Sequence, residues 1–313
     1  MRKRCLPLLA AAILVLCSSG CGAPGASSAP LTVLTIGTAD TGGTMYPVGS
    51  AIAEALSSDT LKINLSASTG SQMNIQTLSE GEVDLALVSG DTAYAAFHQA
   101  EYADLRAVAA VFTSVSNWLA PVSIGAEYVH DLSSLRIGVG PENSTTELSA
   151  QAAIKAIGLD TDSTTLVNCS LGAGTEMVLD HQLDAIHGFS GTPISSLSSL
   201  SEKTPCRTLK YTEEELDAIL TSNTIYVPAT LPANTYAGQT EDIATFGVKC
   251  LLCVDASMDE ELVYSLTEAL WNARASLSAA HSAMSVMDDG TFLYEDLPIP
   301  LHSGAEQFYT TLE

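Results

Sequence analysis

Short apolar runs alternate with amphipathic stretches along most of the chain, and loops of small or polar residues join them. Apolar runs of about four to eight residues predict buried strands, whereas apolar positions at helical spacing predict helices. Residues 34–56 predict a strand, a glycine-bearing loop and the start of a helix, and a second series of this kind begins at residue 136. This alternation predicts an α/β protein with mostly parallel sheets.

The same patterns place the remaining elements. Strands are predicted at 61–65, 83–88, 105–112, 136–139, 165–168 and 184–189, and helices at about 71–80, 144–157 and 212–220. Ser144 with Glu147 is predicted to form a capping box at the start of the helix that runs to Ile157, and Ser257 with Glu260 to open a long final helix in the same way. Asp91 is predicted to cap the helix that follows it, and Gly172-Ala173-Gly174 to form a loop before another helix.

Residues 224–254 are rich in prolines and β-branched residues, which favours extended strands over a helix. Two strand–helix series joined by such strands predict two lobes with a cleft between them. We assign 32–122 with 247–313 to the first lobe and 123–246 to the second. Ligands of open α/β sheets bind at the carboxyl ends of the strands, where glycine, serine and threonine gather in this chain.

The loop after the first strand carries candidate binding chemistry. A helix that begins just beyond a strand points unpaired backbone N–H groups outward, which suits an anion or a polar group. Thr41 adds a hydroxyl, and Gly42 with Gly43 permits close approach of a ligand to the backbone. The alternative is an ordinary turn, since glycine and threonine are common in turns. A nucleotide-binding P-loop is not expected, because no Gly-Lys-Ser/Thr follows.

The first residues predict export. Arg2 to Arg4 precede an apolar run, Leu6 to Leu16, and small residues lead to Cys21. This pattern is typical of a secretory signal, here residues 1–20. Small residues directly before a cysteine resemble a bacterial lipoprotein cleavage site, which implies a lipid anchor on Cys21; Cys17 is the rival, but the large Leu16 precedes it. Residues 21–31 then form the lipidated cysteine and a linker, outside the cytoplasmic membrane.

Charge and cysteines narrow the function further. The chain has 36 acidic and 12 basic residues and a net charge of −24. Because nucleic-acid binding requires clustered basic residues, no nucleic acid is expected as a partner. Four cysteines follow the leader: Cys169, Cys206, Cys250 and Cys253. The last two lie three apart in an apolar strand, which favours buried thiols over a redox or metal site, while a disulfide between the first two stays open.

No motif for catalysis is found. A serine hydrolase of the α/β type would show Gly-x-Ser-x-Gly, and a zinc protease His-Glu-x-x-His; neither is present. His187 is the one histidine on a strand that leads to a candidate site loop, although a core histidine is the simpler interpretation. We expect no enzyme activity, no metal and no cofactor.

Seven segments together resemble one family over nearly the whole chain after the leader. In order they are TIGTADTGGTMYPVG, EVDLALVSGDTAY, LRAVAAVF, LRIGVGPENSTTE, LDAIHGFSGTP, LPANTYAGQTEDIATFGV and PIPLHSGAEQFY. They resemble the TAXI-type solute-binding proteins of TRAP transporters. The resemblance implies a two-lobed periplasmic-binding-protein fold of type II, a monomer that binds a small organic acid or an amino acid such as glutamate. It also implies a TRAP-type membrane permease, driven by an ion gradient, as the partner.

The resemblance also implies the ligand-binding residues, which all lie in loops at strand ends. They are Thr41, Gly42, Gly43, Tyr46, Ser89, Asp91, Ser144, Thr145, Thr146, Gly191 and Thr192. Ser89-Gly90-Asp91 stands where the family has Gln-Ser-Asp, and residues 141–147 lack two of its glycines. Two other functions stay open: a lipoprotein that senses a ligand and signals to a membrane receptor, and a hydrolytic enzyme.

Overall fold

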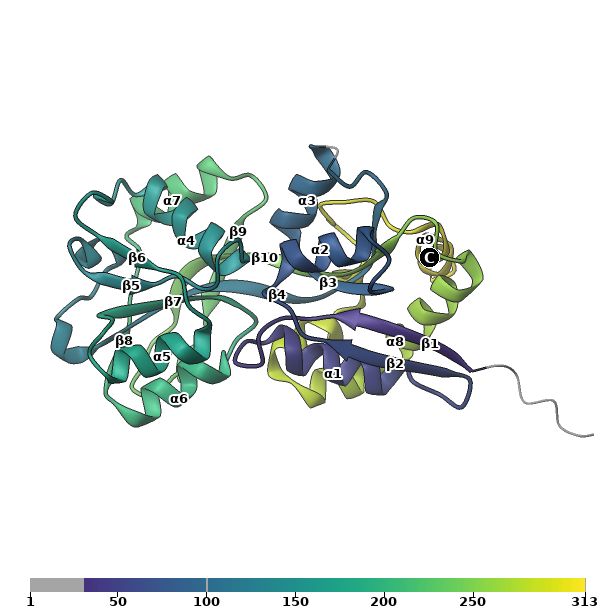
Figure 1. Ribbon diagram of the computed structural model, residues 1–313, viewed down its shortest axis with the longest axis horizontal. Coiled ribbons are helices and arrows are strands. Elements are labelled where there is room, and N and C mark those ends of the chain that lie inside the picture. Colours follow the sequence, from purple (N-terminus) through teal and green to yellow (C-terminus); the bar gives the residue numbers. More distant parts are fainter. Residues whose placement is uncertain (1–30, 100, 313) are drawn as a thin grey trace, which may run out of the picture. The chain divides into compact units, whose positions relative to one another are not determined.

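One mixed sheet runs through the described part of the chain. The structure is a computed structural model that describes residues 31–99 and 101–312, so the predicted leader and Cys21 lie outside it. The strand order is β2-β1-β3-β10-β4-β7-β5-β6, with β8 paired to β4 and β9 to β10 (Figure 1). The strands are β1 Thr32–Gly37, β2 Leu61–Ser66, β3 Leu85–Ser89, β4 Leu105–Pro121, β5 Arg136–Gly138, β6 Thr165–Val167, β7 Ala185–Ser190, β8 Cys206–Thr208, β9 Val227–Leu231 and β10 Ile243–Asp255.

Parallel pairing holds each end of the sheet. β1 pairs in parallel with β2 and β3, and β5 pairs in parallel with β6 and β7. β4 and β10 lie between these groups and pair antiparallel with each other and with their neighbours. The predicted α/β fold is confirmed, with parallel groups of strands on both sides of a central antiparallel pair.

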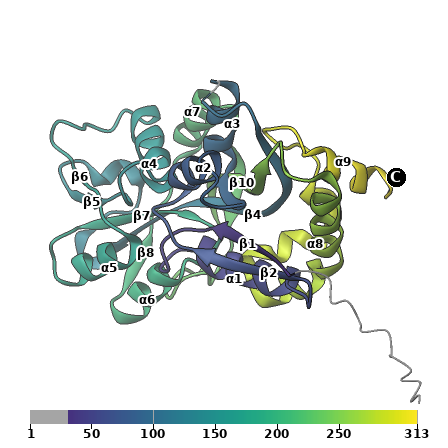
Figure 2. The ribbon, with the colours of Figure 1, turned by 45° about the vertical axis from the view of Figure 1, so that its right-hand side comes forward.

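Helices cover both faces of the sheet. The α-helices are α1 Met45–Leu56, α2 Ser71–Ser79, α3 Gly90–His98, α4 Thr145–Ala156, α5 Leu171–Leu179, α6 Ser195–Lys203, α7 Glu213–Ser222, α8 Glu260–Ala280 and α9 Ser303–Thr310. Around β1 to β3, α1 and α8 pack on one face and α2 and α3 on the other (Figure 2). Around β5 to β7, α4 and α7 pack on one face and α5 and α6 on the other.

Two long strands, β4 and β10, pass through both groups of helices. Val108 and Phe112 of β4 lie in the core with α1 and α8, whereas Trp118 and Ala120 lie in the core with α4 and α7. We call the elements around β1 to β3, with α8 and α9, the first lobe, and those around β5 to β8, with α4 to α7 and β9, the second lobe. The predicted lobe ranges stay a prediction, because β4 and β10 belong to both cores.

Several local predictions were wrong. Asp91 is not the N-cap of α3, because the helix starts at Gly90 with Ser89 as its N-cap, two residues earlier than predicted. Gly172 and Gly174 lie inside α5, whose N-cap is the side chain of Ser170. Asp259, not Ser257, caps α8. In each case a neighbouring oxygen side chain occupies the cap position, and sequence spacing alone does not choose between such neighbours.

The thiols lie as the alternation of the strand predicts. Cys250 and Cys253 are fully buried on opposite faces of β10, in different cores. All four cysteines between residues 31 and 312 are free thiols, so Cys169 and Cys206 form no disulfide. Among the described helices, none is both long and apolar enough to cross a bilayer.

Candidate functional site

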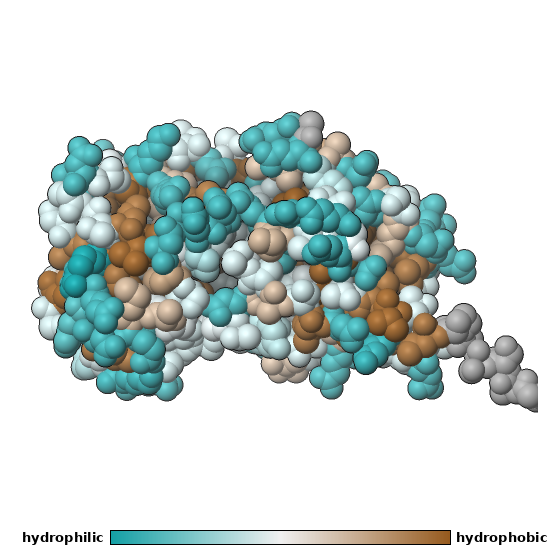
Figure 3. Space-filling model, viewed as in Figure 1, coloured by the Kyte–Doolittle hydropathy of each residue, from teal (hydrophilic) through white to brown (hydrophobic). Residues whose placement is uncertain are grey.

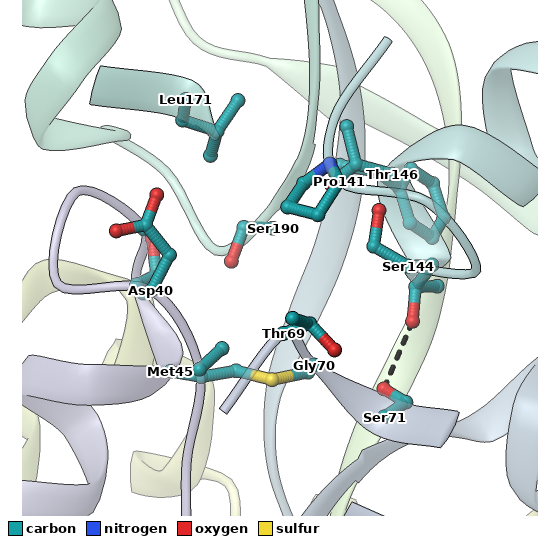
Figure 4. A pocket seen from close by; sticks show the side chains of 15 residues that line it. Asp40, Met45, Thr69, Gly70, Ser71, Pro141, Ser144, Thr146, Leu171 and Ser190 are labelled. Atoms are coloured by element: carbon teal, nitrogen blue, oxygen red, sulfur yellow. Dashed lines mark hydrogen bonds between the residues drawn. The ribbon is translucent and has the colours of Figure 1, made fainter. Parts of the chain in front are cut away.

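A small cavity lies where the N-termini of four helices from both lobes meet. α1 and α2 reach it from the first lobe, and α4 and α5 from the second. The cavity encloses about 40 Å³. Its lining residues are Ala39, Asp40, Gly43, Thr44, Met45, Thr69, Gly70, Ser71, Pro141, Ser144, Thr145, Thr146, Leu171, Phe189 and Ser190 (Figure 4).

The start of α4 presents unpaired donors. The hydroxyl of Ser144 accepts from the amide of Glu147 at 3.2 Å, which caps the helix as the sequence predicts. The Glu147 carboxylate accepts from the amide of Asn143 at 2.6 Å, so the predicted capping box is only half formed. The amides of Thr145 and Thr146 have no acceptor among the described residues. Both amides are available to a ligand, since the first N–H groups of a helix have no partner within it.

The start of α2 faces α4 across the cavity. The hydroxyl of Thr145 donates to the hydroxyl oxygen of Ser71 at 2.9 Å, in a contact between the lobes (Figure 4). Ser71 also accepts from the amide of Ser89 at 2.9 Å. Because two donors already use this oxygen, the O–H of Ser71 remains available to donate to an acceptor in the cavity.

The loop before α1 closes the remaining side. The carbonyl oxygen of Gly42 accepts from the hydroxyls of Ser195 at 3.0 Å and Ser196 at 2.9 Å, both in the second lobe. The hydroxyl of Thr44 donates to the carbonyl oxygen of Gly191. These contacts hold the lobes together directly, so the described conformation is closed.

The charge around the cavity is unusual for an anion site. None of its lining residues is Lys, Arg or His, and Asp40 is the only charged one. Each helix N-terminus carries the equivalent of roughly half a positive charge. Four such termini supply the positive potential that a basic side chain supplies elsewhere. The cavity therefore suits a carboxylate bound by amides and hydroxyls.

The volume shows that a ligand enters by movement. About 40 Å³ holds roughly three water molecules, whereas ligand sites usually measure about 300–1,000 Å³. Two larger grooves, of about 640 and 710 Å³, adjoin the cavity and share Thr69 and Pro141 with it. In the space-filling view the surface dips between the two lobes (Figure 3). Separation of Thr69 from Pro141, which belong to different lobes, would join these spaces.

His187 supports the start of α4 from behind. Its Nδ1 lies 3.1 Å from the carbonyl oxygen of Thr146, and its Nε2 lies 3.1 Å from the hydroxyl of Ser116. A carbonyl only accepts, so Nδ1 carries the proton and Nε2 accepts from Ser116. Burial lowers the pKa of His187 from 6.5 to about 3, so the ring is neutral at physiological pH. His187 is thus a core histidine beside the site.

Asp91 joins the lobes at a different place. Its carboxylate accepts from the hydroxyl of Tyr226 at 3.0 Å and from the amide of Thr92 at 2.8 Å. Burial raises the pKa of Asp91, and these hydrogen bonds partly oppose the rise. Asp91 does not line the cavity, so its contact is one between lobes and not one with a ligand there.

The structure brings together only part of the site that the sequence predicts. Gly43, Ser144, Thr145 and Thr146 line the cavity. The other predicted residues do not line the cavity.

Three of them lie at grooves or contacts between the lobes. Thr41 lines the 640 Å³ groove. The carbonyl groups of Gly42 and Gly191 accept hydrogen bonds from the opposite lobe.

The remaining four lie elsewhere. The amide of Ser89 donates to Ser71 behind α2, and Asp91 contacts Tyr226. Thr192 lines a groove beside β9, and Tyr46 is half-buried and lines none of these spaces.

Sequence reasoning missed other cavity residues. Gly70 and Ser71 lie between the carboxyl end of β2 and the start of α2. The rule that ligands bind at the carboxyl ends of strands therefore applies to them as well. Ser190 ends β7 one residue before the predicted Gly191. Asp40 directly precedes the predicted Thr41 but was not itself predicted. Met45, Leu171 and Phe189 had no signal, because their role depends on how the lobes pack.

Comparison with known proteins decides the family. The model of the NMT1-like family matches residues 36–311. The chain belongs to the NMT1-like family. Among solved structures, a protein of Bordetella bronchiseptica RB50 matches at 16% identity and a TM-score of 0.55, over 89% of each chain.

Two further structures share the fold. The ligand-binding component of an ABC-type import system from Staphylococcus aureus, with zinc bound, matches at 14% identity and a TM-score of 0.52, over 90% of this chain and 91% of that one. The alkanesulfonate-binding protein from Xanthomonas axonopodis pv. citri, bound to MOPS, matches at 16% identity and a TM-score of 0.50, over 90% of this chain and 84% of that one. The fold is that of periplasmic binding proteins, as predicted from the sequence.

Proposed function

We propose that the protein is a lipid-anchored solute-binding protein outside the cytoplasmic membrane. It captures a small carboxylic acid or amino acid by closure of its lobes and delivers it to a membrane permease. The observation that carries this proposal is the convergence of four helix N-termini from both lobes on one cavity. A solute that bridges these termini stabilises the closed form, because the contacts exist only when the lobes meet.

The membrane partner has two candidates. The resemblance of the seven sequence segments to TAXI-type proteins supports a TRAP-type permease. The match to the component of an ABC-type import system from Staphylococcus aureus supports an ABC-type importer as the second candidate. Solute uptake by cells that carry the protein with its native permease separates the two. A TRAP-type partner predicts loss of uptake when an ionophore collapses the ion gradient, and an ABC-type partner predicts loss when ATP is depleted.

The lipid anchor and the location follow from the leader. Residues 1–20 and Cys21 lie outside the described residues, and their support is the sequence alone. A linker of small residues, 22–30, separates the anchor from β1, which begins at Thr32. A lipid on Cys21 would keep the lobes near a membrane permease.

A thermal-shift screen tests the binding function. The panel holds amino acids, 2-oxo acids, dicarboxylates and alkanesulfonates, each at millimolar concentration. At a hundred times its Kd, a solute stabilises the folded protein by about 2.7 kcal/mol, which raises the Tm of a chain of this size by roughly 5 °C. A saturable rise in Tm with one of the carboxylate classes is the expected result. The absence of any rise with every member contradicts the proposal.

A further inference from the structure

The cavity has two chemically different ends. On one side lie Ser71 and the start of α4, with hydroxyl and amide donors; on the other lie Asp40 and the apolar side chain of Leu171 (Figure 4). Between them the hydroxyl of Ser190, which is only 5% exposed, points into the cavity and has no partner among the described residues. Because this hydroxyl has no protein partner there and is not among the fully sealed polar atoms, it can be reached from the cavity and is available to a polar group of a ligand.

Asp40 has an oxygen that the local structure does not use. Oδ1 accepts from the amide of Gly42 at 3.2 Å, which shapes the turn before α1. Oδ2 is buried and has no hydrogen-bond partner among the described residues. An unpaired carboxylate oxygen out of contact with water is costly unless a donor arrives. None of the residues that line the cavity is Lys, Arg or His, so no cationic side chain there supplies that donor.

We propose that Asp40 is a specificity-determining residue that selects solutes with an ammonium group beside their carboxylate over the matching acids without the amine. The ammonium group pairs with Asp40, and the carboxylate lies against the donors of α2 and α4. The inference rests on the proposed function and narrows its solute class to amino acids and similar zwitterions. A dicarboxylate without an amine would place no donor on Oδ2 and would meet a like charge.

Asp40 also lies at the boundary between the inner cavity and the adjoining groove. It lines both the inner cavity and the 640 Å³ groove, together with Thr69 and Pro141. A solute larger than the inner cavity can therefore keep its amine at Asp40 while its carboxylate stays inside. The selection acts at the boundary of the two spaces, where the lobes close.

Isothermal titration of matched pairs tests the proposal on the full-length protein in detergent. The pairs are L-glutamate with 2-oxoglutarate, L-alanine with pyruvate, and L-leucine with 4-methyl-2-oxopentanoate. Asp40→Asn keeps an oxygen for the Gly42 amide and removes the charge. Asp59→Asn, at an exposed position outside the cavity, removes the same charge and serves as control. Melting curves without ligand verify that both variants fold.

We expect at least one amino acid to bind the wild type tenfold or more tightly than its 2-oxo partner, as a charge-assisted hydrogen bond predicts. Asp40→Asn should remove this preference, and Asp59→Asn should keep it. Two results overturn the inference and leave the proposed function in place. One is that the wild type binds every 2-oxo acid as tightly as its amino acid or more tightly. The other is that Asp40→Asn still prefers the amino acid. If no acid of either series binds, the inference fails, and the proposed function fails with it only when the whole thermal-shift panel is negative as well.

Discussion

The hydroxyl of Thr145 lies 2.9 Å from the hydroxyl of Ser71, and this hydrogen bond joins the first turns of two helices from different lobes. It closes the lobes without any ligand, because both side chains belong to the protein. A solute that enters the cavity competes with this contact or adds to it. The contact thus links lobe closure to occupancy of the site.

Thr145→Val should loosen the closed form. The variant keeps the shape of the side chain and loses the donor, which costs about 0.5–1.5 kcal/mol of closure free energy. Hydrogen exchange of the amides at the start of α2 should speed up by roughly two- to tenfold in the absence of ligand. Thr175→Val is the control, since the hydroxyl of Thr175 bonds only within α5, to the carbonyl of Gly172. Equal exchange in wild type and Thr145→Val would show that the contact does not hold the lobes.

Gly247 lies where β10 passes between the lobes, paired with Val115 of β4 and Val227 of β9. A Cβ added there would lie 2.5 Å from the carbonyl oxygen of Ser114. Gly247→Ala should therefore lower the free energy of unfolding by about 1–3 kcal/mol. Urea denaturation measures the loss.

Gly172→Ala is the matched control for that substitution. A Cβ at Gly172 meets nothing within 4 Å, and the residue lies in α5. Because alanine favours a helix over glycine, this variant should gain up to about 1 kcal/mol. Loss of stability in both variants, or in neither, would refute the steric account of Gly247.

His187 gives stability a pH dependence of known sign. Its folded pKa of about 3 lies below the unfolded value of 6.5, so the unfolded chain binds the proton more tightly. The contribution of the neutral ring to the free energy of unfolding is complete above pH 6.5. It is lost as pH falls toward 3, by up to about 1.4 kcal/mol per pH unit. His187→Gln should flatten the slope between pH 6.5 and 4, whereas the exposed His98→Gln should keep it. Parallel slopes for wild type and His187→Gln would argue against a neutral buried ring.

Cys21→Ser should release the protein from the membrane. The predicted lipid is attached to this cysteine, so its loss removes the anchor and the protein appears in the soluble extracytoplasmic fraction. Cell fractionation followed by immunoblotting measures the shift. Cys17→Ser is the control, because Leu16 before it disfavours cleavage there. Release by Cys17→Ser with retention by Cys21→Ser would reverse the assignment.

Much of the fold follows from the sequence, and less of the site does. The apolar runs place β1, β3 and β7 within two residues, because burial on both faces leaves a strong hydrophobic signal. The prediction ended the strand that became β4 at Phe112, although β4 continues to Pro121. Its second half includes Ser114, Ser116 and Asn117, which are polar yet buried where the strand crosses between the lobes.

The site was partly predictable for a similar reason. Thr145 and Thr146 follow from the capping signal at Ser144, which is local in sequence. Leu171 and Phe189 depend on how the two lobes meet, which no single segment encodes. The resemblance implied Tyr46 as a ligand-binding residue in a loop that faces the cleft, but Met45, one residue earlier, is the side chain that lines the cavity. A shift of one position turns a helical side chain by about 100°, which decides between cavity and flank.

Hydrogen exchange at the helix N-termini tests most directly whether one solute bridges both lobes. The protein is saturated with the acid that gives the largest thermal shift, and exchange is followed in peptides that cover 69–73 at the start of α2 and 143–147 at the start of α4. The account predicts slower exchange in both peptides at once, with the same dependence on ligand concentration. Protection of only one of the two, or of neither while the ligand is bound, would contradict it.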